Sequence, residues 1–202
     1  MERETETMPE KGFLLVLMQC PPTLEDEFNA WYDTEHLPER LAVPGFETAL
    51  RFVCLDGNPR YLAMYDLAKH EVLESPAYLK VAYDQSSPWT KRVTSRVRVW
   101  RSSGTQIYPG DATTKRCSRV TLLRFLGLNK EAGRDVVAGV RRAFEDRPET
   151  TQVRVLAHDA GAGGINYLGL VEARMPLAEK IDVKALGPHA DALDLVNTYA
   201  PY

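Results

Sequence analysis

The chain has 202 residues, 44% of them hydrophobic and 26% charged, with a formal net charge of −3. This balance is typical of a globular protein and argues against a nucleic-acid binder, which usually has a basic surface. Three cysteines without metal-ligand spacing argue against a disulfide scaffold and against a metal site. The apolar run at 13–18 is too short to span a membrane, so we expect a soluble, cytoplasmic protein with no membrane partner.

The first predicted elements are a leader, a strand and a helix. Residues 1–11 are polar and acidic, and we expect them to be disordered. The continuous apolar run at 13–18 predicts a buried strand. Apolar residues four, seven and eight positions after Leu24 form the stripe of an amphipathic helix. Pro38 disfavours helical geometry in the residue before it, so the helix is expected to end near His36.

The rest of the first half predicts a hairpin, a helix and a last strand. The hairpin is marked by an Asp-Gly turn between two runs of strand-forming residues. The expected elements are strands at 48–55 and 61–67, a helix at 72–83, and a strand at 93–100 that resumes near 106–108. The resulting order, β-α-β-β-α-β, is ferredoxin-like.

The pattern then restarts after a polar, turn-rich segment. We interpret residues 109–118 as a linker. The elements expected after it are strands at 120–126, 151–157, 167–173 and 193–199, and helices at 131–145 and 182–190. The fold class is therefore predicted as α+β, with a first unit at 12–108 and a second, degenerate unit at 119–202.

Short matches between the two halves support this duplication. Residues 48–51 (Thr-Ala-Leu-Arg) resemble 151–154 (Thr-Gln-Val-Arg), which makes Arg154 the counterpart of Arg51. A four-stranded sheet with helices on one face leaves its other face bare, so two such sheets are expected to pack against each other. The pairing can occur within one chain or in a homodimer.

The halves differ at the end of the first helix. Residues 31–38 (Trp-Tyr-Asp-Thr-Glu-His-Leu-Pro) have no counterpart in the second half. Tyr32 and Asp33 lie four and three positions before His36, so each is a neighbour of His36 on the surface of a helix. A carboxylate from Asp33 or Glu35 and the helix C-terminus would both favour a protonated imidazole suited to proton transfer. The alternative is that His36 caps the helix and the aromatic residues belong to the core.

The same segment resembles a known family. Residues 27–38, followed by Pro-Gly-Phe at 44–46 and a strand carrying Arg51, are similar to the EthD-like branch of the dimeric α/β-barrel superfamily. The resemblance covers about residues 12–66. It implies a fold in which two ferredoxin-like units pack as a dimeric α/β-barrel. The family includes cofactor-free monooxygenases, cyclases, isomerases, decarboxylases and some haem-binding members, with a pocket between helices and sheet.

From the residues and the resemblance together, we expect a cofactor-independent enzyme of lyase, isomerase, cyclase or hydratase type. It would do acid–base chemistry on a small aromatic or enolisable carbonyl compound. The expected catalytic residues are His36, Tyr32, Asp33 and Glu35, and the expected substrate-binding residues are Arg51, Trp31, Phe28, Phe46, Tyr61 and Tyr65. Three alternatives remain open: a protein that binds haem through His36 or binds a small metabolite, a cofactor-free monooxygenase, and a structural or accessory protein without a ligand. The histidines near loops, His70 and His158, are expected to face solvent.

Overall fold

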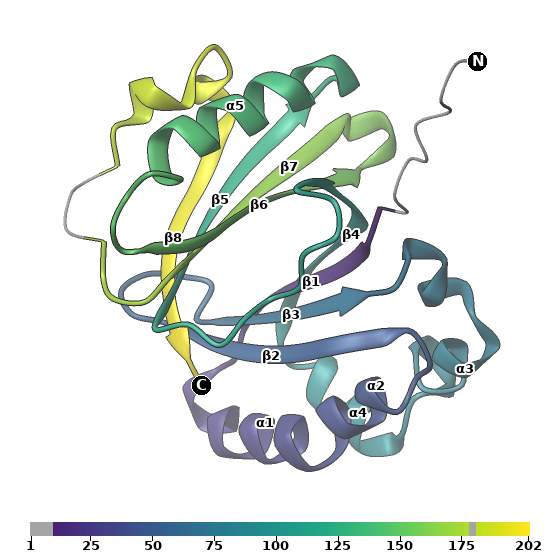
Figure 1. The fold of residues 1–202 in the computed structure, drawn as a ribbon. Helices are drawn as coiled ribbons and strands as arrows, with labels where there is room; N and C mark the ends of the chain where they lie inside the picture. Colours follow the sequence, from purple (N-terminus) through teal and green to yellow (C-terminus); the bar gives the residue numbers. More distant parts are fainter. Residues whose placement is uncertain (1–9, 178–180) are drawn as a thin grey trace, which may run out of the picture.

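The strands of the molecule form one closed antiparallel barrel with the helices outside it (Figure 1). The computed structural model describes residues 10–177 and 181–202, so most of the leader predicted at 1–11 lies outside the described residues. The strands are β1 (Gly12–Gln19), β2 (Phe46–Cys54), β3 (Tyr61–Leu67), β4 (Arg98–Tyr108), β5 (Arg119–Leu128), β6 (Thr150–Asp159), β7 (Ile165–Ala173) and β8 (Leu193–Pro201). Their order around the barrel is β1-β3-β2-β8-β5-β7-β6-β4.

This order consists of two ferredoxin-like halves, β4-β1-β3-β2 and β8-β5-β7-β6, joined at two seams. At the first seam, Phe52–Cys54 of β2 pairs with Tyr199–Pro201 of β8. At the second seam, β4 pairs with β6 from Thr105 to Tyr108. The predicted fold class is therefore confirmed: two tandem ferredoxin-like units form a dimeric α/β-barrel. The two sheets pair within one chain, and they close into a single barrel rather than lying face to face.

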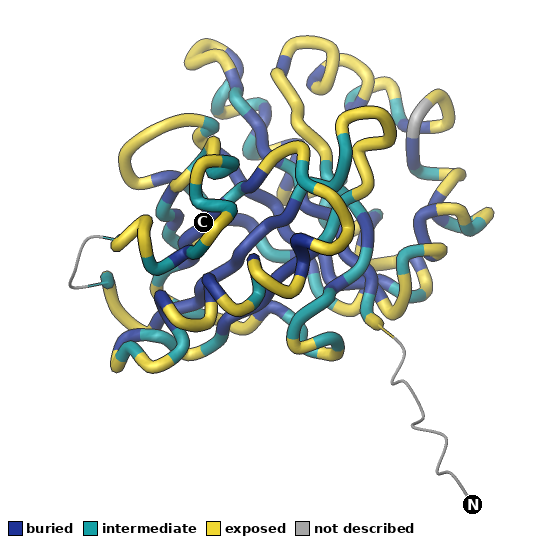
Figure 2. The backbone as a smooth tube through the Cα atoms, turned by 90° about the horizontal axis from the view of Figure 1, so that it is seen from above, coloured by how far each residue is buried: buried dark blue, intermediate teal, exposed yellow. Residues whose placement is uncertain are grey.

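Side chains alternate between the barrel interior and the helix-covered outside, as expected for strands. On β1, Phe13, Leu15 and Leu17 belong to the interior cluster, whereas Leu14 and Met18 belong to the cluster beneath the first-half helices. Figure 2 shows the buried segments gathered along the strands and the exposed segments in the turns around them. The apolar run at 13–18 is thus explained by burial on both faces.

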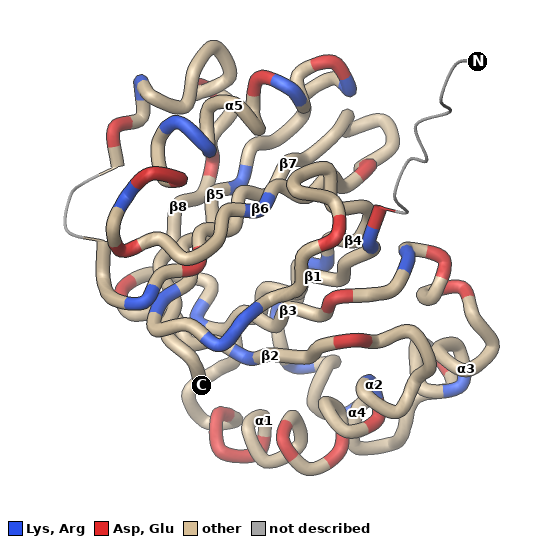
Figure 3. Tube along the Cα trace, viewed as in Figure 1, with Lys and Arg blue, Asp and Glu red and all other residues tan. Residues whose placement is uncertain are grey.

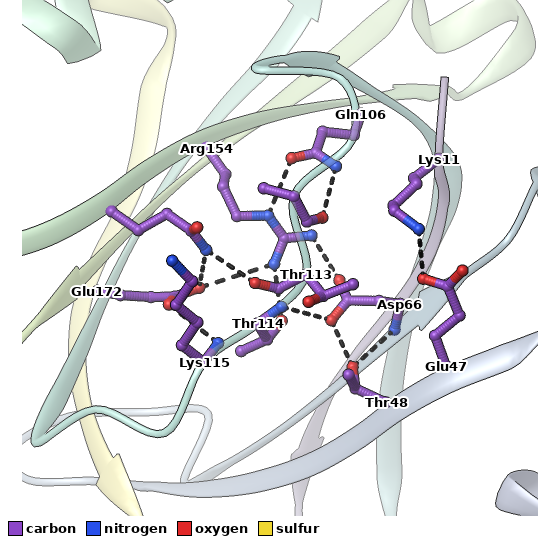
Figure 4. A network of polar contacts seen from close by, with 12 residues as sticks. Lys11, Glu47, Thr48, Asp66, Gln106, Thr113, Thr114, Lys115, Arg154 and Glu172 are labelled. Carbon is purple, nitrogen blue, oxygen red and sulfur yellow. Dashed lines mark hydrogen bonds and ion pairs between the residues drawn. The ribbon is translucent and has the colours of Figure 1, made fainter. Parts of the chain in front are cut away.

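One end of the barrel interior is polar and is organised by Arg154, a fully buried side chain (Figure 4). Its guanidinium donates to Asp66 Oδ1 at 2.5 Å, Thr114 Oγ1 at 2.7 Å and Gln106 Oε1 at 3.1 Å. Glu172 lies 3.7 Å from the same group. Burial raises the pKa of the Glu172 carboxyl. The network joins β3, β4, β6, β7 and the segment between β4 and β5.

The registers correct the predicted match between Arg51 and Arg154. Leu50 pairs with Met64 in the first hairpin, and Arg154 pairs with Leu170 in the second. Residues 61–64 (Tyr-Leu-Ala-Met) resemble 167–170 (Tyr-Leu-Gly-Leu), so Met64 corresponds to Leu170 and Arg154 is the counterpart of Leu50. Arg51 therefore points to the helix side, while Arg154 points into the barrel. A shift of one residue reverses the side-chain direction in a strand, which explains why the two arginines have different surroundings.

The first predicted helix is longer than expected. It comprises α1 (Glu25–Trp31), one π-helical turn (Tyr32–His36) and α2 (Leu37–Leu41). The expected end near His36 is wrong, because the helix continues through a π turn directly before Pro38. Leu37 donates its N–H to the carbonyl of Tyr32, five residues earlier, and the missing N–H of Pro38 then falls at the start of α2.

The helix predicted at 72–83 and the strand start predicted at 93 are also wrong. This region folds as a 3-10 helix (His70–Glu74), α3 (Pro76–Leu79), a second 3-10 helix (Tyr83–Gln85) and α4 (Pro88–Thr94). Ser75 and Ser87 cap the two α-helices by accepting from the N–H of Tyr78 and Thr90. A proline follows each serine and favours a new start, so one long helix does not form.

The second half follows the prediction more closely. The helix expected at 131–145 is α5 (Gly133–Phe144), preceded by a 3-10 turn. The helix expected at 182–190 is replaced by two short 3-10 helices at Val183–Leu186 and Ala190–Ala192. The segment 109–118 has neither helix nor strand. None of the described helices is long and apolar enough to span a membrane.

Candidate functional site

The segment singled out by its sequence lies on the outer side of the first-half sheet, where the π turn faces β2 and β3. A π turn displaces the side chains that follow it by one position around the helix axis, and such turns are frequent at functional sites. Here the turn carries Tyr32, Asp33, Glu35 and His36. Their side chains have different partners.

His36 packs against aromatic rings and is neutral. Its ring centre lies 4.4 Å from that of Trp31 and 5.0 Å from that of Tyr32. Its Nδ1 atom is buried and has no hydrogen-bond partner among the described residues. Burial, followed by the nearby charges of Arg40 and Arg51, lowers the pKa of His36 to about 3. The expected support for a protonated His36 is therefore wrong, because the helix continues past it and Asp33 has another partner.

The low pKa of His36 predicts a pH-dependent stability. In the unfolded chain the imidazole takes up a proton below about pH 6.5, whereas in the folded chain it does so only near pH 3. The free energy of unfolding should therefore fall as the pH drops from 6.5 towards 3, by at most about 1.4 kcal/mol per pH unit. We expect less than this limit because the ring is only partly buried.

Urea unfolding at a series of pH values checks this expectation. His36→Phe keeps a ring beside Trp31 and removes the titrating group, so it should lose that part of the pH dependence. Identical pH profiles for the wild type and the variant would show that His36 does not have a lowered pKa.

Tyr32 and Tyr65 form a buried pair. Their hydroxyl oxygens lie 2.8 Å apart, and each residue is 1% exposed. Burial raises the pKa of Tyr32 to about 12 and raises the pKa of Tyr65 well above its usual value, so both hydroxyls are neutral. The two predicted tyrosines thus lie together, but their hydroxyls form a hydrogen bond with each other.

Arg51 is the centre of a charged and aromatic cluster. Its guanidinium donates to Asp33 Oδ1 at 2.5 Å and to Asn29 Oδ1 at 2.6 Å. The guanidinium carbon lies 4.3 Å from the ring centre of Tyr32 and 4.1 Å from that of Tyr202. The Arg51 side chain is 4% exposed and the Asp33 side chain is 51% exposed. Asp33 thus presents a carboxylate to solvent, held from below by a buried cation.

Glu35 anchors the helix layer instead of orienting His36. Its Oε1 atom accepts from Ser87 Oγ at 2.5 Å and from Thr90 Oγ1 at 3.1 Å. Trp31 donates its ring N–H to the same Thr90 hydroxyl at 3.0 Å. These contacts tie the π turn to the start of α4. Neither Asp33 nor Glu35 therefore orients the imidazole, contrary to the prediction.

The other predicted site residues are part of the core. Phe46 stacks on Tyr78, and Phe28 lies 4.9 Å from the ring centre of Tyr61. The Tyr61 hydroxyl donates to Glu25 Oε1. Burial of the ring, followed by the hydrogen bond to Glu25, raises the pKa of Tyr61. None of these residues lines the pocket described next.

A pocket of about 450 Å³ lies at the first seam, beside β2. Of the predicted residues, Asp33 and Arg51 line it. Sequence reasoning missed its remaining lining residues, which are Leu37, Ala49, Leu50, Phe52, Lys115, Arg116, Cys117, Pro201 and Tyr202. The adjacent Lys-Arg pair at 115–116 was the one signal for them in the sequence. Three cations against one carboxylate make this pocket suitable for an anionic or enolate oxygen.

A second, larger cavity of about 1010 Å³ lies at the other seam. Its lining comes from β4, β6, β7 and the side of α5, and it includes His70 and His158. Both histidines are half-buried, so the expectation that they face solvent is wrong. His158 Nδ1 lies 2.8 Å from the backbone oxygen of Ser103, and His70 Nε2 lies 3.3 Å from the Ser103 hydroxyl.

Comparisons with known proteins support the fold. No family model matches the chain, and no curated protein matches it. An anthrone oxidase-like protein of known structure has a TM-score of 0.67 and 11% identity, over 97% of this chain and 92% of its own. A candidate monooxygenase from Lactobacillus acidophilus NCFM has a TM-score of 0.54 and 8% identity, over 96% and 93%.

A variant of chlorite dismutase from Candidatus Nitrospira defluvii is similar to the same extent. Its TM-score is 0.56 and its identity 9%, over 96% of this chain and 93% of its own. These similarities extend over nearly the whole length of both chains, at very low sequence identity. They agree with the strand order in showing a dimeric α/β-barrel, and they show the fold alone.

Proposed function

We propose that this chain, a dimeric α/β-barrel of the EthD-like branch, is a cofactor-independent enzyme that acts on a small aromatic or enolisable carbonyl compound. The observation that carries the proposal is the Asp33–Arg51 pair at the 450 Å³ pocket. The pocket has apolar walls with a few convergent charged groups, as small-molecule sites usually do.

The geometry favours Asp33 as the general base. Its carboxylate is half-exposed at the pocket and is fixed in position by Arg51. It would take the proton from the carbon next to the carbonyl group; the electron pair of that C–H bond would form a C=C bond, and the π pair of the carbonyl group would move onto its oxygen. The resulting enolate would lie near the positive charge of Arg51, which stabilises it. Returning the proton at another carbon gives an isomerase-type reaction.

His36 and Tyr32 have supporting roles in this proposal. A neutral imidazole with a pKa of about 3 is a poor proton acceptor near neutral pH. Tyr32 stacks beneath the Arg51 guanidinium and keeps it in place. Lyase, cyclase and hydratase reactions can start from the same enolate, so they belong to the same proposal.

A cofactor-free oxygenase is the second candidate function. The names of two structural neighbours, an anthrone oxidase-like protein and a candidate monooxygenase, favour it. The chemistry begins with the same proton abstraction. An electron-rich enolate or phenolate then reduces dioxygen directly, so the substrate supplies the electrons. For anthrone, one molecule of dioxygen would give anthraquinone and water.

Haem does not fit His36. A haem-ligating histidine usually donates its second ring N–H to a carbonyl or carboxylate, and Nδ1 of His36 has no such partner among the described residues. His36 also lines neither of the two cavities described above. We therefore assign no haem-dependent step to it.

One assay tests the proposal and separates the two candidates. The wild-type protein is incubated in D₂O with anthrone and with a panel of enolisable aryl ketones. We expect enzyme-dependent deuterium incorporation next to the carbonyl group, followed by NMR or mass spectrometry. Dioxygen consumption beyond the protein-free rate would identify an oxygenase. If every compound takes up deuterium only at the protein-free rate and no dioxygen is consumed, both candidate functions are contradicted.

A further inference from the structure

The segment 109–118 runs beside β2 and brings two cations to the pocket. Figure 3 shows its basic stretch next to β2, which agrees with Lys115 and Arg116 as pocket-lining residues. Both residues are exposed. Neither side chain forms an ion pair with a carboxylate of the described residues, whereas Arg51 is paired with Asp33. The pocket therefore contains two cations without a carboxylate partner in the part of the chain that the structure describes.

The backbone that carries these cations is held in place by buried carboxylates (Figure 4). The N–H of Thr114 donates to Asp66 at 2.6 Å, and the N–H of Lys115 donates to Glu172 at 3.1 Å. Both carboxylates are buried and lie within ion-pair distance of Arg154. Lys115 and Arg116 are thus presented from a fixed position, unlike cations on an unsupported loop.

Such an arrangement is suited to an anionic ligand. Three like charges around one pocket repel one another, and one carboxylate offsets only part of that charge. A ligand anion bound between Lys115 and Arg116 would remove the remaining imbalance. The apolar walls formed by Leu37 and Ala49 would contact the rest of the ligand.

We propose that Lys115 and Arg116 recognise a carboxylate, so that the substrate class is a small aromatic or enolisable carbonyl compound that also carries a carboxylate group. This inference rests on the proposed function, because it names the substrate of the same pocket. It assigns the segment between the two halves a role in substrate recognition in addition to joining them.

Calorimetric titration of the full chain with a matched pair of probes tests the inference. The probes are 4-hydroxyphenylacetate and 4-hydroxyphenylacetamide, which differ in the charge of one group. We expect the wild type to bind the carboxylate at least about tenfold more tightly than the amide, with a preference that falls as salt is added. Lys115→Ala/Arg116→Ala should lose the preference and keep its affinity for the amide.

A charge-matched control is Arg174→Ala/Lys184→Ala, which removes one arginine and one lysine that are exposed and line neither cavity described above. It should keep the full preference. Equal affinity of the wild type for both probes, no binding of either probe, or a preference that survives in Lys115→Ala/Arg116→Ala would each overturn the inference.

The outcome is separate from that of the proposed function. Turnover of neutral ketones without a carboxylate preference would leave the enzyme proposal standing and refute the carboxylate site. A carboxylate preference lost in Lys115→Ala/Arg116→Ala, without turnover of any compound, would support the carboxylate site and contradict the enzyme proposal.

Discussion

Asp33→Asn is expected to lower turnover by about 10²- to 10⁴-fold, the usual contribution of a positioned general base. The substitution keeps the size of the side chain and a hydrogen-bond acceptor for Arg51, but an amide cannot accept the substrate proton. The fold should be retained because the Asp33 side chain is half-exposed. The measurement is the rate of deuterium incorporation or of dioxygen consumption at saturating substrate, with thermal unfolding as a check on folding.

Two variants of the same π turn provide the controls for Asp33→Asn. Glu35→Gln removes a charge whose partners are Ser87 and Thr90 in the helix layer, so its turnover should stay within about threefold of the wild type. His36→Ala removes a ring with a pKa of about 3. The opposite result would assign proton transfer to His36: His36→Ala would lose about 10²-fold or more of its turnover, and Asp33→Asn would keep nearly all of it.

Arg154→Met is expected to lower the free energy of unfolding by about 3–5 kcal/mol, the usual cost of removing one partner from a buried ion pair. The arginine is 0% exposed and is the cation that offsets Asp66 and Glu172. Methionine fills part of the same space. The decrease in the free energy of unfolding would therefore come mainly from the two buried carboxylates that are left without a cation. Urea unfolding followed by circular dichroism measures it.

The control for Arg154→Met is Arg124→Ala. Arg124 forms two hydrogen bonds with Asp194 on the barrel surface, where both side chains are partly exposed, and such pairs contribute about 1 kcal/mol or less. Arg154→Lys keeps the charge but cannot reach Asp66, Thr114 and Gln106 with one planar group, so an intermediate loss is expected. A loss for Arg154→Met as small as that for Arg124→Ala would contradict the role of the network.

The fold was largely predictable because strands have a simple local signal. Alternating or continuous apolar runs bounded by turns predicted the strands and their order along the chain. The duplication predicted that the two halves pair with each other. The helices between β3 and β4 were not predictable in the same way. Ser75-Pro76 lies inside the helix predicted at 72–83 and Ser87-Pro88 follows it, and each pair starts a short helix of its own.

The site was predictable only within about residues 12–66, the part of the chain that the family resemblance covers. Asp33 and Arg51 were both singled out, and the structure pairs them. Tyr202 reaches the same pocket because the barrel closes at β2 and β8, and Lys115 reaches it because its backbone N–H is held by Glu172; a single sequence reveals neither contact. The low pKa of His36 likewise depends on burial by distant elements, which local spacing cannot show. Arg154 was matched to the wrong strand position because a pattern of four residues does not fix the register.

The two seams of the barrel have a consequence for how this molecule can change. In a symmetric dimer both junctions are built from the same surface, so every substitution appears at each of them. Here the β2–β8 junction and the β4–β6 junction consist of different residues, and each has its own cavity. Selection can therefore reshape one cavity without altering the other. A duplication of one unit within the chain would thus have given the barrel two cavities free to diverge in shape and charge.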